Sequence, residues 1–141
     1  MTEPSLRVLG GLGGRVLDTS ALIELALGRT QYARAFVRWS TAQGVTWAVP
    51  SSALAEAWSL LSDKGRSNLA VLVQLGHAVV EPLALPHAGP VGEILEAAGA
   101  GGDVCAAHVA EVAARRSWPI LTNRGVLLRS MIPGLEIEPL P

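Results

Sequence analysis

Three carboxylates stand at places in the sequence where an acidic side chain is unusual. Asp18 ends a short apolar run, Glu56 is the single charge in the apolar stretch 53–61, and Asp103 follows a pair of glycines. If they meet, two like charges about 4 Å apart repel by roughly 4 kcal/mol at an effective dielectric constant of about 20. A divalent cation removes this repulsion, and oxygen ligands favour Mg²⁺ or Mn²⁺. Such an ion activates water against a phosphodiester.

Each acid also has a purely structural interpretation. Asp103 is a natural helix N-cap, and Asp18 fits the turn that follows a strand. Glu56 is harder to explain in this way, because Ala53 and Leu60 lie beside it on the same helix face. An ionised carboxylate on an apolar face is costly unless it is paired or bound to a cation. Glu56 therefore favours a site.

Alternating strand and helix patterns predict the scaffold that positions these acids. Right-handed crossovers between successive strands give a three-layer α/β/α domain with a five-stranded parallel sheet. Residues 1–14 are expected to form a flexible arm before a single domain over 15–141, with 63–67 a polar break and 83–90 a proline-containing loop. The expected strands are 15–18, 45–49, 78–82, 119–122 and 135–137; the expected helices are 19–27, 31–43, 53–62, 68–75, 91–98, 103–116 and 126–131.

The topology suggests where the acids go. In a parallel sheet, strand ends and the starts of the following helices share one edge, so Asp18, Glu56 and Asp103 are expected to converge there. Thr19 or Ser20 is expected to cap the first helix, and Ser51 with Ser52 the helix after the second strand.

Composition limits the possible functions. The chain has 141 residues, half of them hydrophobic, and a formal net charge of −1. A generally basic nucleic-acid binder is excluded, so any RNA contact must be local. The single cysteine excludes an internal disulfide, and no apolar run is long enough to cross a membrane. With no signal-peptide pattern at the start, a cytoplasmic location is expected.

The ordered motifs resemble those of PIN-domain ribonucleases, including VapC-type toxins. The first is Val16-Leu17-Asp18-Thr19-Ser20-Ala21-Leu22, the second runs from Val49 to Glu56, the third from Gly102 to Ala110, and the fourth is Pro119-Ile120-Leu121-Thr122-Asn123-Arg124. The resemblance covers about Arg15 to Ile137. It implies a Mg²⁺- or Mn²⁺-dependent cut in single-stranded RNA, with Asp18, Glu56 and Asp103 as metal-site acids. It also implies a homodimer and an antitoxin partner.

The fourth motif departs from the family pattern, which has Thr-x-Asp. Here Arg124 replaces the acid, or Asn123 does if the register slips by one. An arginine close to the acids either forms ion pairs with them and competes with the metal, or points outward to an RNA phosphate. Thr19, Ser20 and Thr122 are candidates for orienting the carboxylates or the attacking water; otherwise they cap a helix or fit a strand.

Three functional hypotheses remain open at this point. The first is a metal-dependent endoribonuclease that acts as a toxin. The second is a catalytically impaired PIN domain that binds RNA or protein, which Arg124 favours. The third is a phosphoryl-transfer or receiver-type domain, ranked last because no second acid lies close to Asp18 in the sequence. The apolar stripe of Tyr32, Phe36 and Trp39 is expected to be core or dimer surface, and Cys105 a small core residue.

Overall fold

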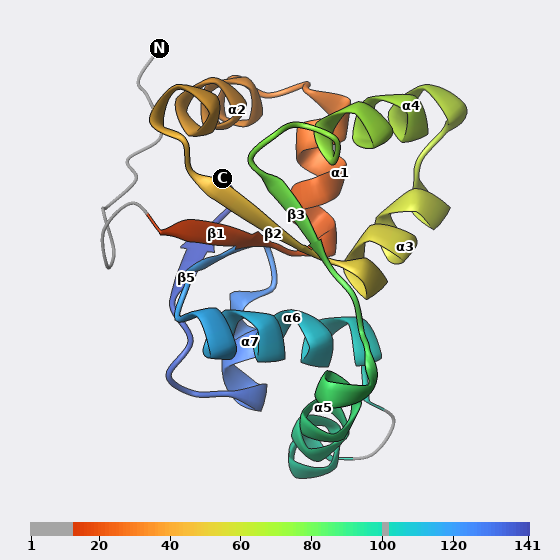
Figure 1. Cartoon of the computed structure of the whole chain (residues 1–141), viewed down its shortest axis with the longest axis vertical. Coiled ribbons are helices and arrows are strands. Elements are labelled where there is room, and N and C mark those ends of the chain that lie inside the picture. Colours follow the sequence, from red (N-terminus) through yellow and green to blue (C-terminus); the bar gives the residue numbers. More distant parts are fainter. Residues whose placement is uncertain (1–12, 100–101) are drawn as a thin grey trace.

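The computed structural model describes residues 13–99 and 102–141, in which one or two helices separate each strand from the next (Figure 1). The alternation predicted from the sequence is confirmed. The strands are β1 (Gly14–Leu17), β2 (Thr46–Pro50), β3 (Ala78–Glu81), β4 (Ile120–Thr122) and β5 (Ile137–Pro139); the helices are α1 (Thr19–Leu27), α2 (Gln31–Gln43), α3 (Ser51–Leu60), α4 (Asp63–Leu72), α5 (Leu85–Ala98), α6 (Val104–Arg116) and α7 (Gly125–Met131).

The five strands form one parallel sheet with the order β3-β2-β1-β4-β5. The chain first moves outward from β1 through β2 to β3, then returns to the other side of β1 for β4. The strand order therefore reverses at the β1–β4 boundary. In open α/β sheets the crevice beyond the carboxyl ends of the strands at such a reversal is the usual place for a ligand. The segments that follow β1 and β4 flank this crevice.

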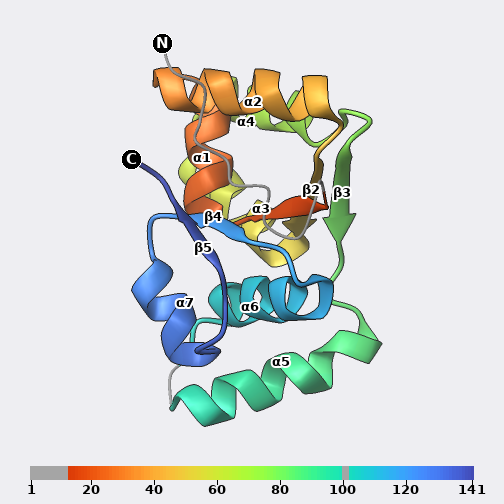
Figure 2. The ribbon, with the colours of Figure 1, turned by 90° about the vertical axis from the view of Figure 1, so that its left-hand side faces the viewer.

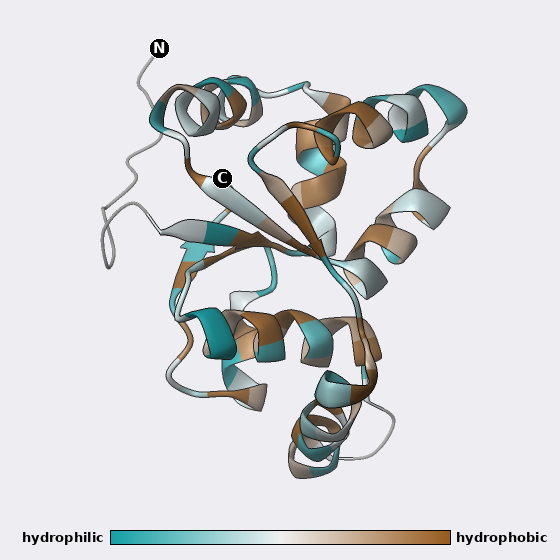
Figure 3. Cartoon of the chain, viewed as in Figure 1, coloured by the Kyte–Doolittle hydropathy of each residue, from teal (hydrophilic) through white to brown (hydrophobic). Residues whose placement is uncertain are grey.

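Helices cover both faces of the sheet (Figure 2). α1, α2 and α4 lie on one face, while α6 and α7 lie on the other with α5 outside them. α3 contacts both α1 and α6, so it links the two helical layers. Hydrophobic residues concentrate in the strands and the inner helix faces, whereas the outer helix faces are mixed (Figure 3). Among the described residues, no helix is long and apolar enough to span a membrane.

Two helices extend into segments that were expected to be irregular. The polar break at 63–67 is the first half of α4, because the side chain of Ser62 accepts the Gly65 N–H and caps the helix. Asp63 in the first turn also interacts favourably with the helix dipole. The loop expected over 83–90 is largely part of α5, where Pro86 occupies the first turn and so needs no N–H partner.

The first strand begins one residue earlier than the predicted range 15–18. β1 begins at Gly14, and a Cβ added there would lie 2.6 Å from the Thr46 carbonyl oxygen and 2.7 Å from the Trp118 ring. A side chain at position 14 would clash with these groups, so glycine is needed for β1 to pack closely against the indole of Trp118. Residues 1–12 of the arm expected over 1–14 lie outside the described residues, so its flexibility stays a prediction.

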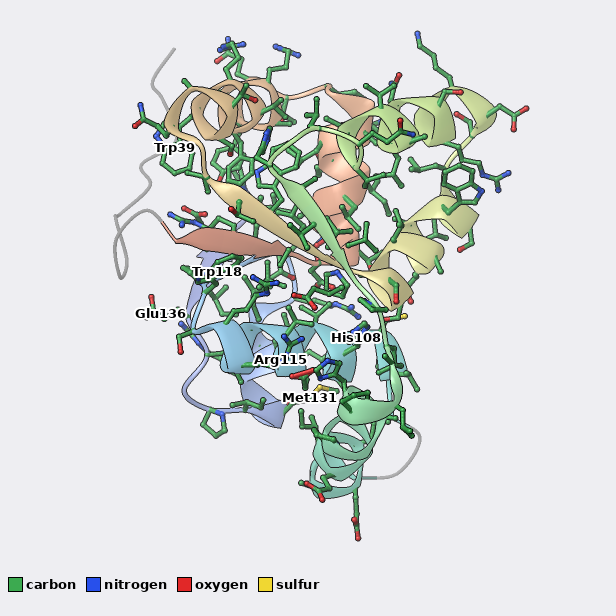
Figure 4. All side chains as sticks on the ribbon, viewed as in Figure 1. Trp39, His108, Arg115, Trp118, Met131 and Glu136 are labelled. Atoms are coloured by element: carbon green, nitrogen blue, oxygen red, sulfur yellow. The ribbon has the colours of Figure 1, made fainter. Side chains whose placement is uncertain are left out.

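The aromatic stripe of α2 belongs mainly to the core. Phe36 is fully buried and stacks on Trp47 of β2, with Tyr32 and Trp39 partly buried beside it. Trp39 also lies against the guanidinium of the buried Arg15 (Figure 4). The two alternatives for this stripe thus resolve in favour of the core.

Candidate metal centre

Asp18 lies at the carboxyl end of β1, the central strand, and its side chain is completely buried. It caps α1 itself, in place of the Thr19 or Ser20 cap expected from the sequence. Its Oδ1 accepts the backbone N–H of Thr19 at 2.8 Å, and its Oδ2 accepts the hydroxyl of Thr122 at 2.7 Å. Both donors are fixed by secondary structure, so the carboxylate orientation is set by the start of α1 and the end of β4.

Arg124 supplies the other two donors to Asp18. Its Nε and one terminal nitrogen lie 2.7 and 2.8 Å from the two carboxylate oxygens, in a bidentate pair. A carboxylate offers about four acceptor positions. The two donors of Arg124, together with those of Thr19 and Thr122, therefore occupy all the acceptor positions of Asp18.

The remaining terminal nitrogen of Arg124 joins a second acid. Nη1 lies 2.7 Å from Oδ2 of Asp103, whose Oδ1 accepts the Ala106 N–H and caps α6. One guanidinium therefore bridges the ends of β1 and α6. Hydrogen bonding to Asp18 raises the pKa of Arg124 above its ordinary value, so the bridge stays cationic. Of the two alternatives for Arg124, the structure has the inward ion pair.

Glu56 reaches the same place from α3. Ligand atoms of Glu56, Asp103 and Cys105 all lie within 4.8 Å of one another, and all three residues are half-buried. Because Asp103 belongs both to this group and to the Arg124 bridge, the three acids gather at one edge of the sheet, as the topology predicted. Three carboxylates and one guanidinium leave a formal charge of −2.

Three polar positions from the sequence motifs have definite places. Ser20 accepts the backbone N–H of Asn123, which ties α1 to the segment after β4. Asn123 is exposed, so Arg124 and not Asn123 occupies the fourth motif position. The Thr19 hydroxyl is buried and has no hydrogen-bond partner among the described residues, so only its backbone holds Asp18.

Sequence reasoning missed two features beside the acids. Cys105 is not a core residue: it lines the acid group, and its thiol donates to the Ser52 carbonyl at 3.3 Å. Burial, together with Glu56 and Asp103, raises the pKa of this thiol. The only sequence signal was its place two residues after Asp103.

The second missed feature links α3 to α6. The Ser52 hydroxyl lies 2.6 Å from Nδ1 of the fully buried His108 (Figure 4 shows His108 on α6). The helix begins at Ser51 after Pro50, so Ser51 and Ser52 do not cap it as expected. Instead, Ser52 and His108 hold together the two helices that carry Glu56 and Asp103.

The arginines at the end of α6 form a separate ion-pair group. Arg115 pairs with Glu111 and Glu81, and Arg116 pairs with Glu81. Both arginines are therefore paired with carboxylates of the chain itself. This group stabilises the junction of α6 with β3.

Comparison with known proteins identifies the fold family. The sequence model of the PIN domain matches residues 15–124. The chain belongs to the PIN-domain family. The resemblance seen in the ordered motifs is confirmed at the level of the family. The comparison with curated proteins gave no match.

Solved structures of complexes share the same architecture. VapBC2 from Rickettsia felis, bound to a DNA fragment from its promoter, is 19% identical with a TM-score of 0.68, covering 90% of this chain and 98% of that one. DNA-bound VapBC from Salmonella typhimurium is 24% identical with a TM-score of 0.63, covering 89% and 97%. FitAB bound to the IR36 DNA fragment is 17% identical with a TM-score of 0.61, covering 89% and 94%. At these identities the likeness establishes the PIN fold.

The buried His108 predicts that the stability of the fold depends on pH. Burial lowers its pKa from the ordinary 6.5, although Glu111 and Glu81 act in the opposite direction. A base whose folded pKa is lowered stabilises the fold above its unfolded pKa, and that stabilisation is lost as the pH falls through the folded pKa. We therefore expect the Tm to decrease below pH 6.5. Thermal unfolding followed by circular dichroism between about pH 8 and pH 5 measures this.

The matched variant is His108→Gln, in which the decrease should be smaller. Burial also lowers the pKa of His77. Wild type and His108→Gln both keep His77, so the difference between their pH slopes reports on His108. An equal pH slope in both proteins assigns the acid sensitivity to other groups.

Proposed function

We propose that this PIN domain is a Mg²⁺- or Mn²⁺-dependent endoribonuclease that cuts single-stranded RNA and serves as the toxin of a toxin–antitoxin pair. The observation that supports it most is the meeting of Asp18, Glu56 and Asp103, from β1, α3 and α6, at one sheet edge. The donor set fits such an ion, because these acids offer oxygen ligands at the reversal of strand order. A divalent ion bound there stabilises charge on the phosphodiester and activates water.

The residues have distinct roles in this proposal. Glu56 and Asp103, both half-buried, offer carboxylate oxygens to the cation and to water around it. Asp18 joins them only when Arg124 leaves, since its acceptor positions are all occupied in the structure. Thr122 keeps Asp18 oriented, and the tie between Ser20 and Asn123 holds the segment that carries Arg124.

A cleavage assay with Glu56→Gln tests this function. Purified wild type should cut a single-stranded RNA in Mn²⁺ and not in excess chelator. Glu56→Gln should cleave at least about tenfold more slowly, because it removes one anionic ligand while keeping the size of the side chain. Glu93→Gln, at an exposed position of α5, is the matched control and should cleave as wild type. No metal-dependent cleavage by the wild type contradicts the proposal.

The second candidate is a metal-free module that binds RNA or a protein. The observation that favours it is Arg124, whose guanidinium satisfies Asp18 and Asp103 without any metal. In that case wild type binds RNA equally well with Mn²⁺ or chelator and cuts in neither. The same assay, read together with RNA binding by fluorescence anisotropy, separates the two functions.

We also propose an antitoxin partner and a homodimer. The solved structures similar in fold are named as VapBC and FitAB complexes, which supports a protein partner. Exposed apolar side chains of α3 and α4, Trp58, Leu60 and Val71, offer a surface for it. We expect sedimentation equilibrium to give about twice the chain mass of 14.7 kDa. A monomer at micromolar concentration contradicts the homodimer.

A further inference from the structure

The ion pair between Arg124 and Asp18 blocks the cation that the proposed function requires. Asp18 cannot bind a cation while the guanidinium occupies both of its oxygens at 2.7 and 2.8 Å. Asp18 is also completely buried, with no exposed surface. If Arg124 simply swung away, it would leave an uncompensated charge without water around it, which is strongly unfavourable. The guanidinium can leave only as another cation arrives.

Arg124 itself needs a new partner when it leaves. Its side chain is 22% exposed, so part of Arg124 already faces solvent at the rim of the site. A guanidinium presents parallel N–H groups in a fixed fork that matches the oxygens of a phosphodiester as well as those of a carboxylate. Asp103, the other acid it holds, is 35% exposed and can exchange this partner for water. A phosphate at the rim is therefore the natural acceptor.

We propose that a phosphodiester of single-stranded RNA takes Arg124 from Asp18 and Asp103 while a divalent cation takes its place between the acids. This inference rests on the proposed function, which supplies the cation and the RNA. Arg124 is then a positioning residue that couples two binding events. Because coupling between ligands is reciprocal, RNA tightens metal binding by the same factor as the metal tightens RNA binding. RNA and the divalent cation therefore bind tightly when both are present, and either one alone binds weakly.

Metal affinity measured with and without a nucleic-acid strand tests the coupling. The probe is a 2′-O-methyl oligonucleotide about ten nucleotides long, checked by gel to remain intact, and Mn²⁺ affinity is read from the electron paramagnetic resonance signal of free Mn²⁺. Saturating oligonucleotide should tighten Mn²⁺ binding to wild type by about tenfold, within the usual range of such couplings. A methylphosphonate strand, which lacks the backbone charge, should have little effect.

The variant Arg124→Met isolates the role of the guanidinium. It should bind Mn²⁺ more tightly than wild type when no strand is present, and the oligonucleotide should tighten binding much less than in wild type. Arg124→Lys keeps the charge without the fork and should show intermediate coupling, which also serves if the methionine variant is poorly folded. Arg29→Met, at an exposed position beyond the far end of α1, should behave as wild type.

The outcomes separate this inference from the proposed function. Equal tightening in wild type and both Arg124 variants, or none in wild type, overturns the coupling even if RNA is cleaved. Coupling in wild type that Arg124→Met removes supports it even if an unmodified single-stranded RNA is not cleaved in the separate assay, in which case only the nuclease proposal fails. An absence of Mn²⁺ binding under all conditions overturns both.

Discussion

Asp18→Asn should reduce Mn²⁺-dependent RNA cleavage by more than about 100-fold, because partners outside the metal's direct ligands are themselves worth about 10- to 100-fold. Asn keeps the shape of Asp18 and remains a good N-cap for α1. What it removes is the buried negative charge that faces Arg124 and the proposed cation. Cleavage of a labelled single-stranded RNA, followed over time in Mn²⁺, measures the effect.

The matched control for this change is Asp63→Asn. Asp63 also lies at the start of a helix, α4, but its side chain is fully exposed. It should cleave as wild type. Thermal unfolding shows whether Asp18→Asn is folded, because a folded but inactive variant is the informative case. Unchanged cleavage by a folded Asp18→Asn removes this residue from the reaction.

Arg124→Asp should tighten Mn²⁺ binding by at least about tenfold. The change restores the fourth acid of the family pattern and moves the formal charge of the centre from −2 to −4. A unit charge about 4 Å away contributes roughly 4 kcal/mol at an effective dielectric constant of about 20, and about 1.4 kcal/mol is enough for tenfold. Isothermal titration calorimetry with Mn²⁺ compares the two affinities directly.

Stability gives a second measurement of the same change. Without metal, Arg124→Asp should have a lower Tm than wild type, since it loses both ion pairs and adds repulsion between carboxylates. Mn²⁺ should then raise its Tm more than that of wild type, because a ligand stabilises the state that binds it. Arg29→Asp makes the same charge change at an exposed site beyond the C-terminal end of α1 and should alter neither quantity. Matching Mn²⁺ affinities in wild type and Arg124→Asp refute competition by the guanidinium.

Much of the scaffold was predictable because local patterns and global topology agree. The apolar run before Asp18 and the helical spacing after it place this acid at a strand end without reference to the rest of the chain. The predictions that were wrong involve residues whose type fits more than one structural role. Ser52 is a residue type that often caps a helix, but its hydroxyl instead forms a hydrogen bond with His108, 56 residues away. Pro86 suggests a loop, yet it also fits the first turn of a helix.

The sequence by itself determined the set of acids, their order and the sheet edge at which they meet, because strand and helix periodicity fix which end of each element they occupy. Only the tertiary structure decided what Arg124 does. An arginine in a loop can turn either way, and its direction depends on Asp18 and Asp103, which are 106 and 21 residues distant in the chain. Folding brings both carboxylates within reach of one guanidinium, and their combined charge turns it inward.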